Sequence, residues 1–141
     1  RLRQVEILHD AGRSINPAID LGQIEGGFVQ GAGWLTSEEL WWDKQGALRT
    51  HAPSTYKIPV SSDVPEKFNV SIWSGGGNRE PTIQRSKAVG EPPLMLAISV
   101  HSAINQAIAS VRPGRTIPPL DAPATPERVL MCIECLRRDS A

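Results

Sequence analysis

The stretch from Pro17 to about Glu39 constrains the fold most, because it starts like a helix but contains residues that weaken one. Asn16 and Pro17 supply an N-cap and a proline at the first helical position. Each interior glycine costs roughly 1 kcal/mol relative to alanine, so a solitary helix of this composition would be unstable. The glycines of this stretch are Gly22, Gly26, Gly27, Gly31 and Gly33. Two pairs of them are four residues apart, which bares one face of backbone for another element or a flat ligand.

Extended segments are predicted on both sides of this helix. Alternating apolar residues predict strands over Val5–His9 and Phe68–Trp73. Turn residues between Leu40 and Thr50 predict a hairpin, and Ser54–Ile58 reads as a short extended run that ends at Pro59.

Two more helices complete the expected elements. Apolar residues recur with a helical period over residues 94–111, and Pro113-Gly114 ends that pattern. Thr125-Pro126 caps a last amphipathic helix that closes with Arg137-Arg138. The order of elements predicts an α+β fold in which a mostly antiparallel sheet is faced by helices.

Composition excludes several classes of function. The chain has 141 residues, which favours one domain, and its 15 basic and 15 acidic residues cancel. No basic stripe points to nucleic acid, and no apolar run predicts a membrane span. Two cysteines do not form a disulfide framework, and no signal peptide is apparent, so we expect a cytoplasmic protein. The start at Arg1, without methionine, leads us to expect a piece of a longer chain.

Three short patterns fail as functional motifs. Cys132 and Cys135 have C-x-x-C spacing, but they come late in a helix and the three histidines are scattered, so two reduced thiols are the favoured interpretation. Gly75-Gly76-Gly77 lacks the Lys-Ser/Thr of a phosphate loop and reads as a flexible surface loop. The glycines of the first helix do not follow the dinucleotide-binding pattern.

Glu91 is the strongest catalytic candidate. It lies in Lys87-Ala88-Val89-Gly90-Glu91-Pro92-Pro93, where stiff backbone holds a carboxylate just before a helix. Such a carboxylate suits a general base, although a glutamate at a helix start more often only stabilises the helix, and the local sequence does not reject that alternative. Gln23, among the glycines, could hydrogen-bond a planar heterocycle or a phosphate, or be an ordinary surface residue. Four tryptophans could stack on a ligand or, more commonly, be buried or form an interface: Trp34, Trp41, Trp42 and Trp73.

Three long segments, read together, resemble the molybdopterin-binding part of the xanthine dehydrogenase family. They run from Asp10 to Gly31, from Pro53 to Pro59 (Pro-Ser-Thr-Tyr-Lys-Ile-Pro) and from Ser86 to Leu94. Their order and spacing agree with that family, and the resemblance covers nearly the whole chain. Aldehyde oxidases share the general plan, but the Pro-Ser-Thr-Tyr-Lys-Ile-Pro segment is closer to the xanthine enzymes.

The resemblance implies that residues 1–141 are the C-terminal portion of the molybdopterin-binding domain of a large subunit. It implies that Glu91 is the general base that activates a molybdenum-bound hydroxyl in the oxidation of hypoxanthine and xanthine to urate. Gln23 and Gly90 would contact the molybdenum–molybdopterin cofactor, and no residue of this chain is expected to ligate the metal. Gly75-Gly76-Gly77, where relatives carry more polar residues, is expected to be peripheral.

The resemblance also implies partners. The rest of the subunit would complete the cofactor and purine sites, and 2Fe-2S and FAD would lie in other modules of an oligomeric enzyme. The isolated segment would then be inactive. An aldehyde oxidase-type hydroxylase, or a non-catalytic scaffold that keeps the fold, are the alternatives.

Overall fold

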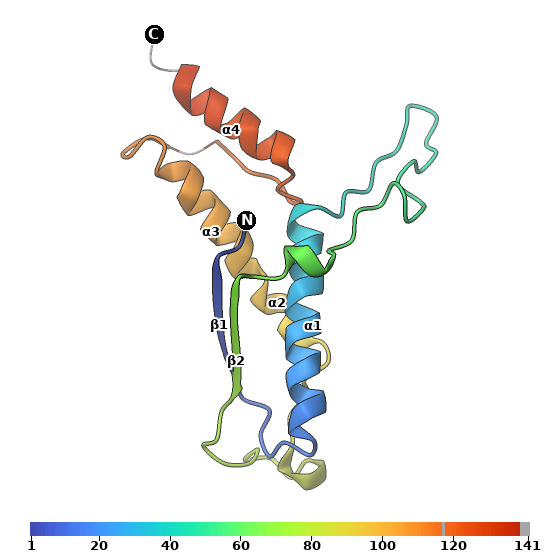
Figure 1. Cartoon of the computed structure of the whole chain (residues 1–141), viewed down its shortest axis with the longest axis vertical. Coiled ribbons are helices and arrows are strands. Elements are labelled where there is room, and N and C mark those ends of the chain that lie inside the picture. Colours follow the sequence, from blue (N-terminus) through green and yellow to red (C-terminus); the bar gives the residue numbers. More distant parts are fainter. Residues whose placement is uncertain (117, 139–141) are drawn as a thin grey trace. The chain divides into compact units, whose positions relative to one another are not determined.

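The computed structural model of the protein describes residues 1–116 and 118–138 (Figure 1). These residues form two compact units. Unit 1 comprises Arg1–Gly31 and Val60–Leu96, and unit 2 comprises Ala32–Pro59 together with the described residues from Ala97 onward. The helices and strands are, in chain order, β1 (Gln4–His9), α1 (Pro17–Thr36), β2 (Lys67–Ile72), α2 (Pro92–Leu96), α3 (Ile98–Ala109) and α4 (Pro126–Arg138), with short 3-10 turns at Ser61–Asp63 and Ile83–Arg85.

The sheet of unit 1 is parallel, so the predicted mostly antiparallel sheet is wrong. β1 pairs only with β2 among the described residues, with Gln4 opposite Lys67 and His9 opposite Ile72. The two strands run in the same direction because the intervening chain, which includes α1, crosses back before β2 begins. Within residues 1–116 and 118–138, antiparallel pairing is limited to two isolated bridges, Gly12 with Ser86 and Trp42 with Leu48. The mixed α+β composition stands.

The core of unit 1 forms where α1 packs on this small sheet. Ile24 and Phe28, one helical turn apart on α1, are fully buried, and the Phe28 ring lies 5.5 Å from that of Phe68 on β2. Burying a side chain of this size contributes about 3 kcal/mol at most. Asn16 caps α1 as predicted, because its side-chain oxygen accepts a hydrogen bond from the Ile19 amide (3.3 Å).

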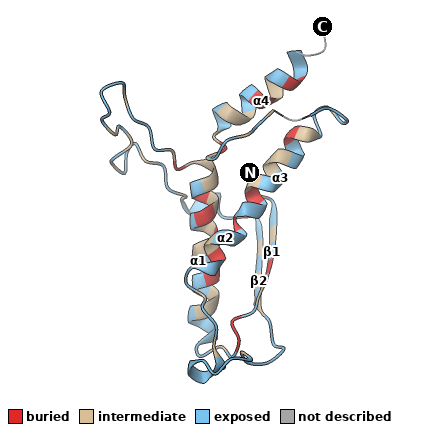
Figure 2. Cartoon of the chain, turned by 180° about the vertical axis from the view of Figure 1, so that it is seen from behind, coloured by how far each residue is buried: buried red, intermediate tan, exposed pale blue. Residues whose placement is uncertain are grey.

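Unit 2 has a separate core between α3 and α4. Ile108 of α3 packs with Cys132 and Leu136 of α4. Figure 2 shows buried positions, in red, on both helices. The Thr125 hydroxyl accepts a hydrogen bond from the Arg128 amide, which confirms the predicted cap of α4.

Two local predictions are corrected, and a third is met only in part. The helix expected over residues 94–111 is divided at Ala97 into α2 and α3. The extended run expected at Ser54–Ile58 begins as a turn, in which the Ala52 carbonyl accepts hydrogen bonds from the amides of Thr55 and Tyr56. The expected hairpin at 40–50 is reduced to a turn and the single Trp42–Leu48 bridge.

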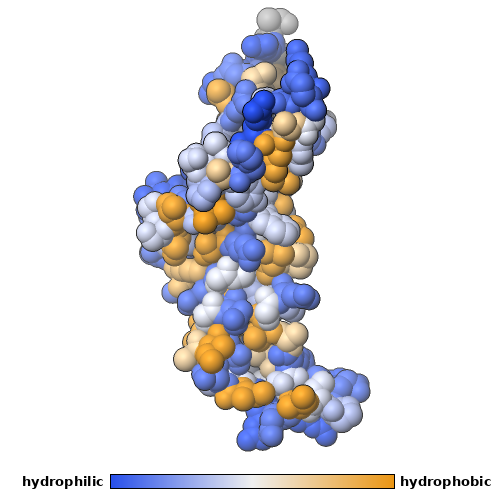
Figure 3. All heavy atoms as spheres, turned by 90° about the vertical axis from the view of Figure 1, so that its right-hand side faces the viewer, coloured by the Kyte–Doolittle hydropathy of each residue, from blue (hydrophilic) through white to orange (hydrophobic). Residues whose placement is uncertain are grey.

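The chain exposes more surface than its size requires. Its accessible area is 9763 Å², whereas a compact monomer of this length exposes about 7100 Å², and two separate compact units of half that mass expose about 8600 Å² together. Apolar side chains lie among polar ones on the face shown in Figure 3. Because separating the two units can only add exposed area, the units themselves are less compact than globular domains of their size. Within the described part of the chain, no helix combines the length and the apolar character needed to span a bilayer.

Candidate functional site

Glu91 is the residue that immediately precedes α2 in unit 1. Its carbonyl accepts a hydrogen bond from the Leu94 amide (3.1 Å), so its backbone closes the first turn. Its side chain is exposed, and it takes part in none of the ion pairs between described residues. Because α2 has only five residues, the helix dipole at Glu91 is smaller than the one expected from a long helix at this point. Gly90, the other predicted residue of this segment, is also exposed.

The segment that carries Glu91 is anchored on α1 at Gly27. A methyl group added to Gly27 would lie 2.9 Å from the Pro93 Cβ and 3.4 Å from the Leu94 nitrogen. Pro93 is fully buried, so its ring cannot turn away. The absence of a side chain at Gly27 thus lets the backbone of the Glu91 segment lie directly on the helix, as the glycine spacing led us to expect for part of this face.

Gln23 lies one helical turn, about 5.4 Å, from Gly27 along α1. Glu91 is two residues, at most about 7 Å, from Pro93. Gln23 and Glu91 therefore each lie within a few residues of the Gly27–Pro93 contact. Gln23 is exposed between Gly22 and Gly26, and nothing lies within 4 Å of a methyl group built on either glycine. This face, Gly22-Gln23-Gly26, is bare backbone with one amide side chain on it.

A second anchor precedes Glu91, where residues 10–13 after β1 meet residues 85–87. The Lys87 amide donates to the Ala11 carbonyl (2.8 Å), and the Arg13 amide donates to the Arg85 carbonyl (3.0 Å). Gly12 is buried between them with φ +61, and a methyl group on it would lie 2.5 Å from the Arg85 oxygen. Only glycine combines that φ with so close an approach.

The same junction contains an ion pair. The Lys87 ammonium contacts the Asp10 carboxylate, whose other oxygen accepts a hydrogen bond from the Gly12 amide (2.9 Å). The hydrogen bond from Lys87, followed by that from Gly12, lowers the pKa of Asp10 below its usual 3.8. Sequence reasoning missed this pair because its members are 77 positions apart and neither belongs to a periodic pattern.

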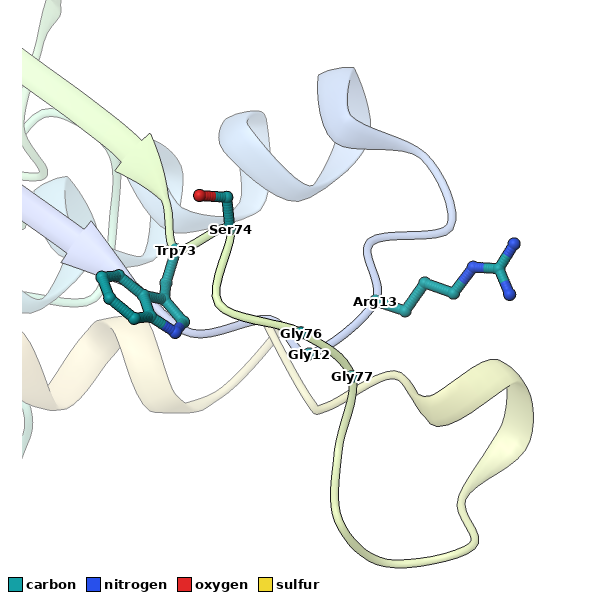
Figure 4. Close-up of a pocket in the computed structure, with 6 residues that line it drawn as sticks. All are labelled: Gly12, Arg13, Trp73, Ser74, Gly76 and Gly77. Atoms are coloured by element: carbon teal, nitrogen blue, oxygen red, sulfur yellow. The ribbon is translucent and has the colours of Figure 1, made fainter.

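An open pocket of about 330 Å³ lies beside this junction, lined by Gly12, Arg13, Trp73, Ser74, Gly76 and Gly77 (Figure 4). The side chains of Trp73, Ser74 and Arg13 point in different directions, and Arg13 extends away from the glycines. Since no polar side chains converge there, the pocket does not have the features of a ligand site.

Unit 2 contains a buried carboxylate that the sequence patterns did not single out. Glu38 is buried after the end of α1, and its side chain accepts a hydrogen bond from the Tyr56 hydroxyl (2.6 Å). This bond, with a smaller contribution from desolvation, raises the pKa of Tyr56 above its usual 10.0. Tyr56 belongs to the Pro-Ser-Thr-Tyr-Lys-Ile-Pro segment, so the pair fixes that segment to the residues that follow α1.

The remaining candidates form no site in the structure. Cys132 is buried and Cys135 exposed, and both are free thiols. Across residues 1–116 and 118–138, no cluster of three or more histidine, cysteine or acidic residues could hold a metal ion. The predicted tryptophans Trp34, Trp41, Trp42 and Trp73 are each about half-exposed.

Comparison with known proteins defines the class. Residues 1–65 match the family of molybdopterin cofactor-binding domains. Among solved structures, quinoline 2-oxidoreductase from Pseudomonas putida 86 superposes with a TM-score of 0.83 at 30% identity, over 95% of this chain and 16% of that one. A Cu,Mo-CO dehydrogenase superposes with a TM-score of 0.80 at 25% identity, over 96% of this chain and 16% of that one.

Closer sequence relatives specify the family. "Xanthine dehydrogenase 1" of Arabidopsis thaliana is 50% identical over 139 residues, which cover 92% of this chain and 10% of the relative. "Xanthine dehydrogenase/oxidase" of Gallus gallus is 52% identical over 129 residues, which cover 89% of this chain and 9% of the relative. The chain belongs to the molybdopterin-binding part of the xanthine dehydrogenase family, and the predicted resemblance is confirmed. It spans about a tenth of the length of these curated relatives, and the expected cofactor, molybdenum bound to molybdopterin, agrees with the matched domain family.

Proposed function

We propose that this chain is the C-terminal portion of the molybdopterin-binding domain of a molybdenum hydroxylase, and that this enzyme oxidises hypoxanthine and xanthine to urate. In this proposal Glu91 is the general base, and Gln23 and Gly90 contact the cofactor. One observation carries it: Glu91 is an exposed carboxylate without a cationic partner in the described chain, and it is fixed near the bare glycine face that carries Gln23. The close sequence relatives named xanthine dehydrogenase support the choice of purine substrates.

The residues of α1 fit a large planar cofactor. Gly22 and Gly26 leave room for a group to lie against the backbone, and the Gln23 amide can both donate and accept hydrogen bonds to a heterocycle. When bound, the molybdenum cofactor supplies the redox centre that accepts the two electrons of the oxidation. Gln23 and Gly90 would hold that cofactor from this chain's side, while the rest of the subunit supplies the remaining contacts.

Glu91 performs the proton transfer in this mechanism. A general base must be ionised when its proton arrives and must lie within hydrogen-bonding distance of the donor. No lysine or arginine among the described residues pairs with the Glu91 carboxylate, so its oxygens are available to take up a proton. The Gly27–Pro93 contact limits where this carboxylate can lie, which is what a positioned base requires.

The complete enzyme would contain further modules. The excess exposed surface of this chain supports a large interface with the rest of the molybdopterin-binding subunit. We propose that 2Fe-2S and FAD modules carry electrons away, and that the enzyme is a cytoplasmic oligomer. The 141 residues alone are expected neither to retain molybdopterin nor to oxidise xanthine, and urate formation by the isolated chain would contradict this.

A different substrate is the second candidate. The aldehyde oxidoreductase from Desulfovibrio desulfuricans ATCC 27774 superposes with a TM-score of 0.70 at 26% identity. The name of that protein supports an aldehyde as the substrate of the same site. A third alternative, a scaffold without catalytic activity, predicts no turnover of any substrate. Assays of the complete enzyme with xanthine and with an aromatic aldehyde separate these readings.

The test of the mechanism is Glu91→Gln in the complete enzyme, with Glu80→Gln, at an exposed loop glutamate of unit 1, as the control. Loss of a general base lowers turnover by about 10² to 10⁴-fold. Molybdenum content should stay constant in both variants, and Glu80→Gln should retain full turnover. Normal turnover of Glu91→Gln would remove Glu91 from the mechanism.

Cofactor contact by Gln23 is tested separately. Gln23→Ala should lower the molybdenum and pterin content of the purified enzyme. Glu25→Ala changes an exposed residue about 200° around α1 from Gln23 and should leave cofactor content unchanged. Equal cofactor content in the two variants would contradict the proposed role of Gln23.

A further inference from the structure

We infer that Asp10 and Lys87 are positioning residues for Glu91, because their ion pair fixes the start of the Glu91 segment to the turn that follows β1. This inference rests on the proposed function of Glu91. It assigns a role in the reaction to a pair that lies outside the predicted site.

The segment between the two anchors has little support of its own. Ala88, Val89 and Gly90 take part in no backbone hydrogen bond within the described part of the chain. Ala88 and Gly90 are exposed, and only Val89 is half-buried. The next internal hydrogen bond is the one from the Leu94 amide to the Glu91 carbonyl. The position of Glu91 is therefore set by the two ends of this segment.

The C-terminal end of the segment is fixed by the contact of Pro93 with Gly27, and the N-terminal end is fixed by Lys87. Lys87 is held twice, through its amide to Ala11 and through its ammonium to Asp10. Asp10 is held in turn, because its other carboxylate oxygen accepts a hydrogen bond from the Gly12 amide. The side-chain contact therefore connects the last fixed residue before Glu91 to the turn that follows β1.

An ion pair at this exposure contributes little to global stability. Its geometric effect is different, because only three residues separate Lys87 from Glu91 and a small rotation at Lys87 displaces the carboxylate. A misplacement of about 1 Å can reduce a rate by about 10²-fold. The pair is thus expected to change turnover much more than stability.

The experiment uses the complete molybdenum hydroxylase with Lys87→Met and Asp10→Asn. Asp10→Asn keeps an oxygen for the Gly12 amide and removes only the charge. Both variants should lower kcat per molybdenum about 10-fold or more, with KM and molybdenum content unchanged, because a displaced base affects the transition state alone. Lys87→Arg should recover most of the lost kcat. In the cofactor-free protein, the amides of Arg13 and residue 87, which donate hydrogen bonds to Arg85 and Ala11, should exchange hydrogen faster in Lys87→Met than in the unmodified chain.

The matched control is Arg3→Met, which removes an exposed ion pair to Glu66 (2.7 Å) at the opposite end of the same two strands. It should leave kcat per molybdenum and exchange at the amides of Arg13 and Lys87 unchanged. If Lys87→Met and Asp10→Asn both keep full kcat, or if Arg3→Met reduces it equally, the positioning role is wrong. That result would leave the general-base proposal standing as long as Glu91→Gln is inactive, whereas an active Glu91→Gln would refute the base itself.

Discussion

Neighbouring glycines on α1 should respond to the same substitution in opposite directions. A methyl group at Gly27 would lie 2.9 Å from the Pro93 Cβ, whereas ordinary contacts begin near 3.4 Å, so helix and loop must separate by about half an ångström. Such overpacking costs about 1–3 kcal/mol, and the better helix propensity of alanine returns about 1 kcal/mol. Gly27→Ala is therefore expected to destabilise α1 by about 1 kcal/mol.

Gly26→Ala is the control, since nothing lies within 4 Å of a methyl group at that position. It should stabilise α1 by up to about 1 kcal/mol through helix propensity alone. Native-state hydrogen exchange of the α1 amides in the cofactor-free complete protein measures both changes as opening free energies. The reasoning is refuted if Gly27→Ala slows exchange as much as Gly26→Ala does.

Three further predictions concern the core of unit 1 and two titratable groups, Tyr56 and Asp10. Phe28→Ala should destabilise unit 1 by about 3–5 kcal/mol, measured by urea unfolding, because a fully buried ring is lost. Tyr56 is the chain's single tyrosine, so its ultraviolet absorbance should titrate above pH 10.0 in the folded chain and closer to 10.0 in Glu38→Gln. The stabilisation from the Tyr56–Glu38 hydrogen bond is present below the unfolded-state pKa of Tyr56 and is lost as pH rises through its folded-state pKa. The Asp10 pKa, followed by NMR, should rise toward 3.8 in Lys87→Met, and the stabilisation by this pair should be lost as pH falls through the depressed folded pKa.

Helices were the part of the fold that the sequence predicted best, because their signals are local. Asn16 and Thr125 cap α1 and α4 as predicted, since an N-cap depends on the next few residues only. The helix over 94–111 was predicted as one piece because its apolar period continues through Ala97, where the structure divides it.

Strand direction was not predictable by the same reasoning. The alternation in Val5–His9 and Phe68–Trp73 identified both strands, but residues paired across the sheet are 63 positions apart. Alternation specifies which face of a strand is buried and carries no information on the direction of its neighbour. The contacts around Glu91 were hidden for the same reason, because Asp10, Gly12 and Gly27 reach its segment only through the fold.

Some glycines of unit 1 are required by close contacts in the fold, and others have no such contact. Gly12 and Gly27 allow close contacts within unit 1, and a side chain at either would meet backbone or a buried proline ring. Gly22 and Gly26 have no such neighbour, yet each weakens α1 by roughly 1 kcal/mol relative to alanine. No contact within the described chain offsets that cost. Since these two glycines flank Gln23, their cost supports a ligand, supplied from outside this chain, that must approach the helix backbone.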